Sequence, residues 1–175
     1  MLIKEDTISR NGAILSAMKL NYSHEYHGST DDVVALFRKP EFIEDVAKHA
    51  GALEHTVTVE GDTTHLRLTL PAPSAIAPFV GKGIKIAQSF AWGDPDEAGT
   101  RRGTVTVDVA GVPVAVEAQG LLSPNGENAS TAQYEGDLEV KIPLVGKKVE
   151  SQVEPMIKSA FAGIERRVNA WLTKS

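Results

Sequence analysis

The chain of 175 residues contains no cysteine and no long hydrophobic run. Without cysteine it has no disulfide framework, no thiolate nucleophile and no cysteine-based zinc site, and this composition suits the cytoplasm. No window approaches the roughly 20 consecutive apolar residues that a membrane-spanning helix needs. Residues 1–17 do not form a secretory signal, because charged residues such as Lys4, Glu5 and Asp6 interrupt any apolar core.

Positive charge is also scarce, since 18 Lys and Arg residues stand against 23 Asp and Glu residues and the net charge is −5. A protein that binds nucleic acid through phosphate contacts needs a basic face, so we expect no nucleic-acid partner. The hydrophobic content of 42% and the charged content of 23% are ordinary for a soluble globular protein. We expect residues 1–17 to be a tail, either disordered or preceding a native start at Met18, and residues 18–175 to form a single domain.

Most of the sequence has the period of two that is typical of strands with one buried face. A first strand covers residues 20–27. Two short helices follow it: Ser29 and Asp32 form an N-cap pair for one, and Pro40 opens the other. From Glu54 onward, alternating segments joined by short turns predict about six further antiparallel strands.

The last part of the chain changes to a helical period. From Val149 to Leu172 the apolar residues recur at threes and fours and cover an arc of roughly 160°, which predicts one long amphipathic helix. A sheet of about seven strands that curls around a single helix leaves a volume beside the helix, and that volume is a natural ligand site. Pro155 removes a helix hydrogen bond, so we expect the helix to kink or restart there and to bend away from the sheet.

Three sequence features carry a family resemblance. They are the ending GDLEVKIPLVGKKVE from Gly136 to Glu150, the opening LNYSHE from Leu20, and Phe79-Val80-Gly81 before a strand that ends in Trp92. With them, the chain from Met18 onward resembles the START/SRPBCC superfamily of birch-pollen-allergen-like proteins, and within it an uncharacterised actinobacterial family. The resemblance implies an α+β helix-grip fold with a cavity for a hydrophobic or amphipathic molecule.

The resemblance does not define the function. Members of the wider superfamily carry lipids or sterols, supply subunits to polyketide cyclases or act as cochaperones. The subfamily has no catalytic motif that can be transferred to this sequence.

Few residues of the sequence indicate a catalytic site, a metal site or a cofactor site. On a strand, His24 and His27 point to opposite faces, so we expect no metal site, and no motif indicates a cofactor. His24 is either a core histidine or a pocket residue that binds the polar head of a ligand. Glu150 lies near the helix start, where the helix dipole favours a carboxylate; the alternative is a general base in the cavity.

The stretch from Pro71 to Gly83 combines three prolines and two glycines with apolar residues that include Ile76, Phe79 and Val80. Such a loop is either a lid over the mouth of the pocket or a segment packed on the core.

We therefore expect a protein that binds or carries a lipid-like, quinone-like or polyketide-like molecule between the sheet and the C-terminal helix. The alternatives are a cyclase- or dehydratase-type enzyme that uses the same cavity, and a cochaperone-like interaction module. The expected cavity lining comes from both the sheet and the helix: Tyr22, His24, Tyr26, Leu68, Leu70, Phe79, Gln88, Phe90, Trp92, Tyr134, Leu138, Met156, Ile157, Ala160, Phe161 and Ile164.

Overall fold

The computed structural model describes residues 3–8, 14–74, 77–111, 113–140 and 146–174, with the backbone alone for residues 3–8, 14–17, 79 and 146–150. The elements follow one another as β1 (Ile3–Ile8), β2 (Ile14–Tyr26), α1 (Thr30–Phe37), α2 (Pro40–His49), β3 (Glu54–Glu60), β4 (Thr63–Pro71), α3 (Ala77–Val80), β5 (Gly83–Trp92), β6 (Arg101–Val109), β7 (Val114–Pro124), β8 (Ser130–Val140) and α4 (Gly146–Thr173).

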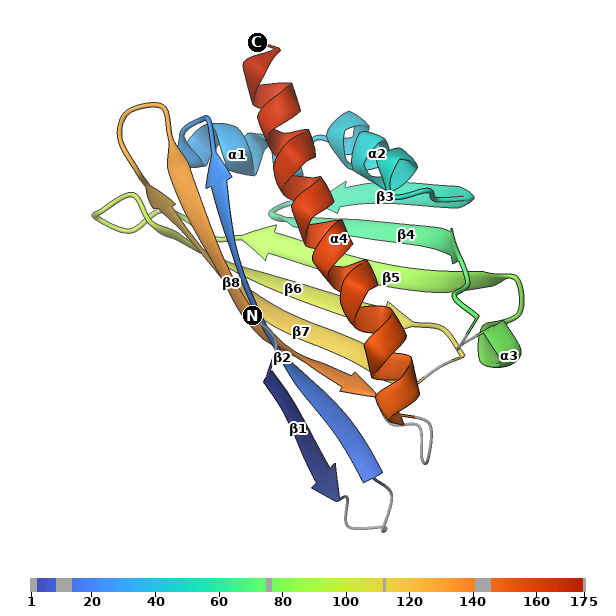
Figure 1. The fold of residues 1–175 in the computed structure, drawn as a ribbon. Helices are drawn as coiled ribbons and strands as arrows, with labels where there is room; N and C mark the ends of the chain where they lie inside the picture. Colours follow the sequence, from blue (N-terminus) through green and yellow to red (C-terminus); the bar gives the residue numbers. More distant parts are fainter. Residues whose placement is uncertain (1–2, 9–13, 75–76, 112, 141–145, 175) are drawn as a thin grey trace.

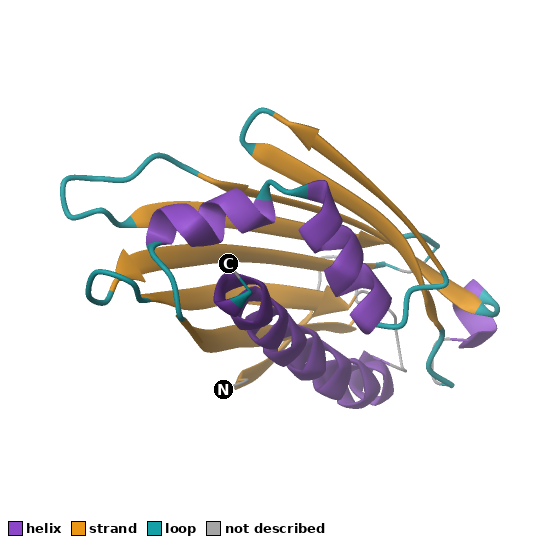
Figure 2. Ribbon diagram, turned by 90° about the horizontal axis from the view of Figure 1, so that it is seen from above, coloured by secondary structure: helices purple, strands orange, loops and turns teal. Residues whose placement is uncertain are grey.

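The strands form one antiparallel sheet in the order β1-β2-β8-β7-β6-β5-β4-β3. It curves so that α4 lies along its concave side, which confirms the predicted α+β helix-grip fold (Figures 1 and 2). The sheet has eight strands because residues 3–8, which the sequence placed in a tail, pair with β2 from Ile3 opposite Lys19 to Ile8 opposite Ile14.

The two short helices begin where their capping residues predict. The Ser29 hydroxyl accepts a hydrogen bond of 3.1 Å from the backbone N–H of Asp32 at the start of α1. Pro40 is the first residue of α2, a position where its missing N–H leaves no helix hydrogen bond unmade. Gly51 follows α2 with a φ of 85°, a conformation that favours glycine.

Helix α4 runs for 28 residues, about 42 Å at 1.5 Å per residue. Pro155 lies inside this uninterrupted helix, so the prediction of a restart at Pro155 is wrong (Figure 1). Pro155 and Ser151, which lies one turn before it, are both exposed. Water can hydrogen bond to a carbonyl on the exposed side, which is why the helix tolerates the proline.

Helix α4 packs chiefly along β2. Beyond Lys19, where the pairing with β1 ends, side chains of α4 bind the free edge of β2. Glu165 accepts a hydrogen bond of 2.7 Å from the N–H of Glu25. Asn169 accepts one of 2.8 Å from the N–H of His27 and donates one of 2.8 Å to the carbonyl of Glu25. These bonds satisfy edge groups that would otherwise be unpaired, and they hold α4 to one side of the sheet.

A second set of hydrogen bonds holds the C-terminal part of α4 to α2. Asp45 accepts hydrogen bonds of 2.8 and 2.6 Å from Arg167 and one of 2.8 Å from the indole N–H of Trp171. Burial acts to raise the pKa of Asp45, but the bonds from Trp171 and Arg167 lower it below its ordinary value. The carboxylate therefore stays charged in this cluster.

Candidate functional site

Inward-facing side chains of neighbouring strands form rows across the concave face of the sheet, because successive residues of a strand alternate between its two faces. One part of this face is the aromatic end, where Phe37 of α1 and Phe42 of α2 form one buried cluster with Phe90, Trp92 and Tyr134 of the sheet. The other part, the valine end, consists of Val57, Val105, Val107, Val109 and Val116.

The aromatic end is filled. Trp92 is buried with its indole against the backbones of Gly103 and Gly120 on the two next strands. A Cβ atom at either glycine would lie 2.6 or 2.7 Å from the indole, so only glycine leaves room for this ring. The Phe37 ring centroid lies 6.3 Å from that of Trp92 and 5.6 Å from that of Phe90.

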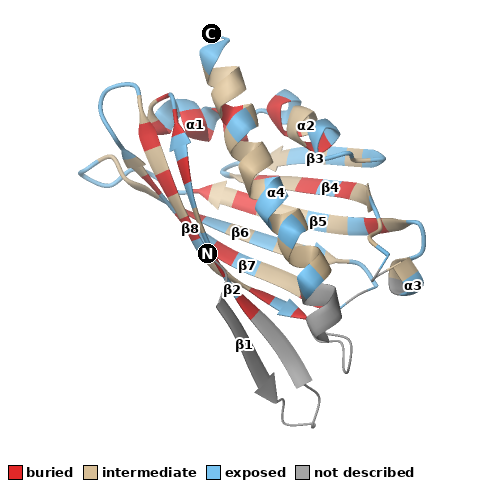
Figure 3. Ribbon diagram, in the orientation of Figure 1, coloured by how far each residue is buried: buried red, intermediate tan, exposed pale blue. Residues whose placement is uncertain are grey.

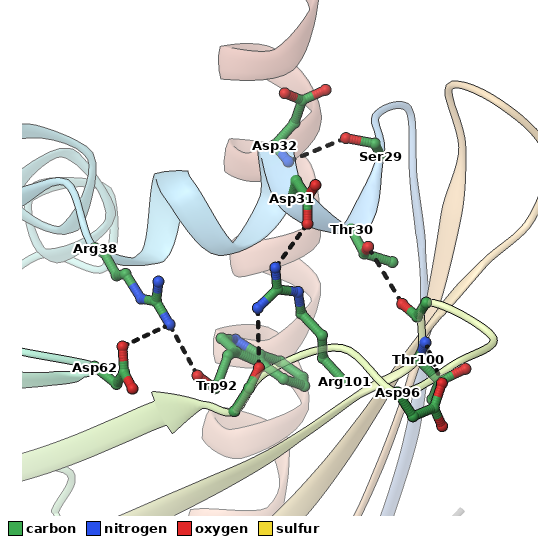
Figure 4. Close-up of polar contacts among 12 residues, drawn as sticks. Ser29, Thr30, Asp31, Asp32, Arg38, Asp62, Trp92, Asp96, Thr100 and Arg101 are labelled. Atoms are coloured by element: carbon green, nitrogen blue, oxygen red, sulfur yellow. Dashed lines mark hydrogen bonds and ion pairs between the residues drawn. The ribbon is translucent and has the colours of Figure 1, made fainter.

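Two arginines fix the aromatic end from outside (Figure 4). Arg38 donates a hydrogen bond of 2.9 Å to the carbonyl of Trp92 and pairs with Asp62 at 3.0 Å. Arg101 donates one of 2.9 Å to the carbonyl of Gly93 and pairs with Asp31 at 2.7 Å. These contacts attach α1 and the segment that follows it to the end of β5, so this part of the sheet is held in place.

The valine end differs in burial. Its residues lie on the concave side of the sheet, and all five remain partly exposed. Strand β6, which carries three of them, is coloured mostly as intermediate and exposed in Figure 3. The fully buried residues form two separate clusters, one at the aromatic end and one around Met18, Ile84 and Leu138. Two partly buried residues, Tyr22 and Ile86, pack against both clusters. Val57 and Val105 pack against the first cluster, and Val109 and Val116 pack against the second, so the inward-facing surface between the clusters is only partly covered.

A chain of hydrogen bonds joins β8 to β2. The hydroxyls of Tyr134 and Tyr26 are 2.9 Å apart, and Tyr26 bonds to Nδ1 of His24 at 2.8 Å. The His24 ring also lies beside Phe161 of α4, with ring centroids 5.9 Å apart.

Burial controls the ionisation of these groups. It lowers the pKa of His24, although the charge of Glu165 and the bond to Phe161 act in the opposite direction. Burial also raises the pKa of both Tyr26 and Tyr134. At neutral pH the chain therefore consists of uncharged groups.

A pocket of about 290 Å³ lies between this chain and α4. Its floor is the Tyr22 ring, which stacks on Phe161 with centroids 4.4 Å apart. The Tyr22 hydroxyl is buried and has no hydrogen-bond partner among the described residues, and burial raises its pKa, with a further contribution from Glu154. The remaining lining is Ser23, His24, Glu154, Lys158, Ala162 and Glu165.

A shallower depression of about 420 Å³ spans β3 to β6. Most of its lining residues, such as Thr56, Arg67, Lys85 and Asp108, alternate with the inward-facing positions, so the depression lies on the outer face of the sheet. It is separate from the space beside α4.

The predicted lining residues fall into three groups by burial. His24, Tyr26, Leu68, Phe90, Trp92, Tyr134 and Leu138 are buried. Tyr22, Leu70, Gln88, Met156, Ile157, Phe161 and Ile164 are partly exposed, and Ala160 is exposed. The side chains of Phe79 and Glu150, and the whole of Ile76, lie outside the described residues.

Four residues that the sequence did not indicate also contribute to this region. Glu154 and Lys158 line the pocket, Asn169 binds the β2 edge, and Glu165 does both. Their only sequence signal is membership of the polar side of α4, which is typical of a solvated helix face.

The described part of the chain holds no group of three or more His, Asp or Glu side chains that could bind a metal ion. In the same residues, no helix has the length and apolar character needed to cross a membrane.

Comparison with solved structures finds this fold in proteins of low sequence identity. A START superfamily protein from Mycobacterium smegmatis has a TM-score of 0.55 and 16% identity, covering 87% of this chain and 98% of that one. A norcoclaurine synthase point mutant from Thalictrum flavum, in complex with a transition-state analogue, has 0.60 and 15%, covering 90% and 95%. The human StarD13 lipid transfer and protein localization domain has 0.56 and 13%, covering 95% and 88%. At such identities the likeness establishes the fold alone.

Sequence comparison is more specific. A search of curated protein sequences finds no match. The family model of DUF2505, described as a protein of unknown function, matches residues 21–172, which is most of the chain. The chain therefore belongs to the DUF2505 family, and it has the helix-grip fold of START superfamily proteins.

Proposed function

We propose that this protein binds a hydrophobic or amphipathic small molecule between the valine end of the sheet and α4. One observation carries the proposal: Val57, Val105, Val107, Val109 and Val116 point inward but remain partly exposed. A soluble domain gains stability by burying such side chains at about 25 cal/mol per Å², so an apolar surface left accessible inside the fold favours a ligand that covers it.

The structural neighbours support the same class of function. One is a lipid transfer domain and another is a synthase in complex with a small molecule. Lipid-like, quinone-like and polyketide-like molecules all have the apolar surface that the valine end would cover. Carriage of such a molecule needs binding alone, whereas an enzyme needs a free acid or base, and Nδ1 of His24 already shares a hydrogen bond with Tyr26.

The segment from Pro71 to Gly83 is a suitable cover for the ligand. Ala72 and Val80 pack against the buried cluster around Ile84, next to Val109 and Val116. Gly81 has a φ of 75°, which glycine adopts without strain, so this residue can serve as a hinge. We propose that the segment moves when the ligand enters or leaves.

Native mass spectrometry of freshly purified protein, followed by extraction of bound molecules, tests the proposal directly. Val107→Phe should fill the space at the valine end and weaken binding of a fluorescent apolar probe or octadecanoate at least tenfold, because the aromatic ring occupies the ligand volume. Thr106→Phe is the matched control, since Thr106 is the exposed neighbour on the other face of β6. Ligand-free protein that binds neither probe, or equal affinities for both variants, would overturn the proposal.

A further inference from the structure

The floor of the pocket between β2 and α4 carries a polar group without a partner. The Tyr22 hydroxyl is buried and makes no hydrogen bond with any described residue. The other two tyrosines of the chain differ, because the hydroxyls of Tyr26 and Tyr134 bond to each other at 2.9 Å. A buried hydroxyl without a partner lowers the stability of a fold, and such groups are rare in folded proteins.

Two unpaired charges of opposite sign lie in the same pocket. Glu154 and Lys158 both line it from α4, about one turn apart, and neither takes part in the ion pairs found among the described residues. The charge of Glu154 contributes to the raised pKa of Tyr22, so this carboxylate lies near the unpartnered hydroxyl. The other charged lining residue, Glu165, is about three turns further along α4 and accepts a hydrogen bond of 2.7 Å from the N–H of Glu25.

This combination favours an uncharged hydroxyl as the polar group of a ligand. A carboxylate only accepts hydrogen bonds and would be repelled by Glu154, and an ammonium group only donates them and would be repelled by Lys158. A hydroxyl does both, so it can donate to the Glu154 carboxylate and accept from the Tyr22 hydroxyl. Each of these two protein groups then gains a partner that the described part of the fold does not supply.

We infer that the ligand is an amphipathic alcohol, and that its hydroxyl binds Tyr22 and Glu154 in the pocket between β2 and α4. This inference rests on the proposed function, in which the apolar part of the ligand covers the valine end. Tyr22 packs against both buried clusters, and the valine end lies between them. The Tyr22 hydroxyl is covered in the structure, so the ligand has to displace the side chains over it, and the new hydrogen bond favours this change.

The test compares decan-1-ol with its isomer 1-methoxynonane, an ether whose oxygen accepts hydrogen bonds but cannot donate one. Glu154→Met keeps the side-chain length and removes the carboxylate; Glu135→Met makes the same change at an exposed position of β8. In wild type and Glu135→Met, we expect the alcohol to bind about tenfold more tightly than the ether, as displacement of a fluorescent apolar probe measures it. In Glu154→Met this preference should disappear. Tyr22→Phe should weaken binding of both molecules about fivefold, because each offers an oxygen to the Tyr22 hydroxyl.

Two ligands with charged heads, decanoate and decylamine, complete the comparison. Both should bind wild type more weakly than decan-1-ol does. Tighter binding of either one, or a preference for the alcohol over the ether that persists in Glu154→Met, would overturn the inference and leave the proposed function standing. Wild-type protein that binds none of the four molecules would overturn both.

The unfolding temperature of the ligand-free protein gives an independent check. Tyr22→Phe should unfold at the wild-type temperature or higher, because its hydroxyl has no partner to lose. Tyr26→Phe should unfold at a lower temperature, because the Tyr26 hydroxyl bonds to both His24 and Tyr134. A lower unfolding temperature for Tyr22→Phe as well would show that the Tyr22 hydroxyl has a partner within the fold, and this would contradict the inference.

Discussion

The two ends of the concave face belong to one sheet but differ in how completely they are packed. At the aromatic end, Trp92 lies against Gly103 and Gly120, and Phe37 and Phe90 close the space around it. At the valine end, smaller side chains such as Val105 and Val107 stay partly exposed. The difference teaches that one sheet can carry both a filled core and a partly covered apolar surface, because side-chain size and the position of the helices decide which part is filled.

The strongest test of this comparison removes a large side chain from the aromatic end. Trp92→Ala should lower the free energy of unfolding by about 3–5 kcal/mol, since it leaves a cavity that the glycine backbone cannot fill. Val107→Ala, at the valine end, should lower the free energy of unfolding by about 1 kcal/mol or less, because Val107 is already partly solvated. Urea denaturation measures both values. Equal losses would mean that the two ends are equally packed.

A smaller effect on stability comes from adding one methyl group to the aromatic end. The new Cβ of Gly120→Ala would lie 2.7 Å from the Trp92 ring and 3.1 Å from the Tyr134 ring, so we expect a loss of about 1–3 kcal/mol from overpacking. Gly163→Ala is the control. Its Cβ would meet no atom closer than 3.8 Å, and alanine should stabilise helix α4 by about 1 kcal/mol. Thermal unfolding separates the two; a neutral Gly120→Ala would show that the aromatic end has free space.

The smallest expected effect is the pH dependence of the hydrogen-bonded chain at His24. Its pKa is lowered in the folded protein, so the unfolded chain binds the proton more readily. The stability from neutral His24 is complete above the unfolded value of about 6.5 and is lost as the pH falls through the lower folded value. Glu165 and the Phe161 backbone offset part of the shift, which keeps the effect small.

The measurement is the unfolding temperature between pH 7.5 and pH 5 for wild type, His24→Gln and His27→Gln. Wild type and His27→Gln should lose stability on acidification, because His27 is exposed on the other face of β2. In His24→Gln that dependence should be reduced. If both variants keep the wild-type slope, another group is responsible for it.

Local patterns were sufficient to predict the order of elements. The alternation of polar and apolar residues indicated the strands, Ser29 and Pro40 marked the starts of α1 and α2, and the helical period marked α4. The pairing of residues 3–8 was missed, because a short strand at the edge of a sheet depends on its partner strand for stability. The long helix was predicted, but the sequence left a restart at Pro155 open, because a proline by itself does not reveal which side of a helix is exposed.

The sequence by itself determined which residues of each strand point inward, since that follows from the two-residue period of the backbone. It did not determine which of those inward residues are buried. Phe90 and Gln88 point to the same side of β5, yet one is buried and the other is partly exposed. Burial depends on remote segments: Arg38 and Arg101 attach the region of α1 to one end of the sheet, and Glu165 and Asn169 hold α4 to the edge of β2. Only the tertiary structure brings these segments together, because the contacts that place them join residues far apart in the chain.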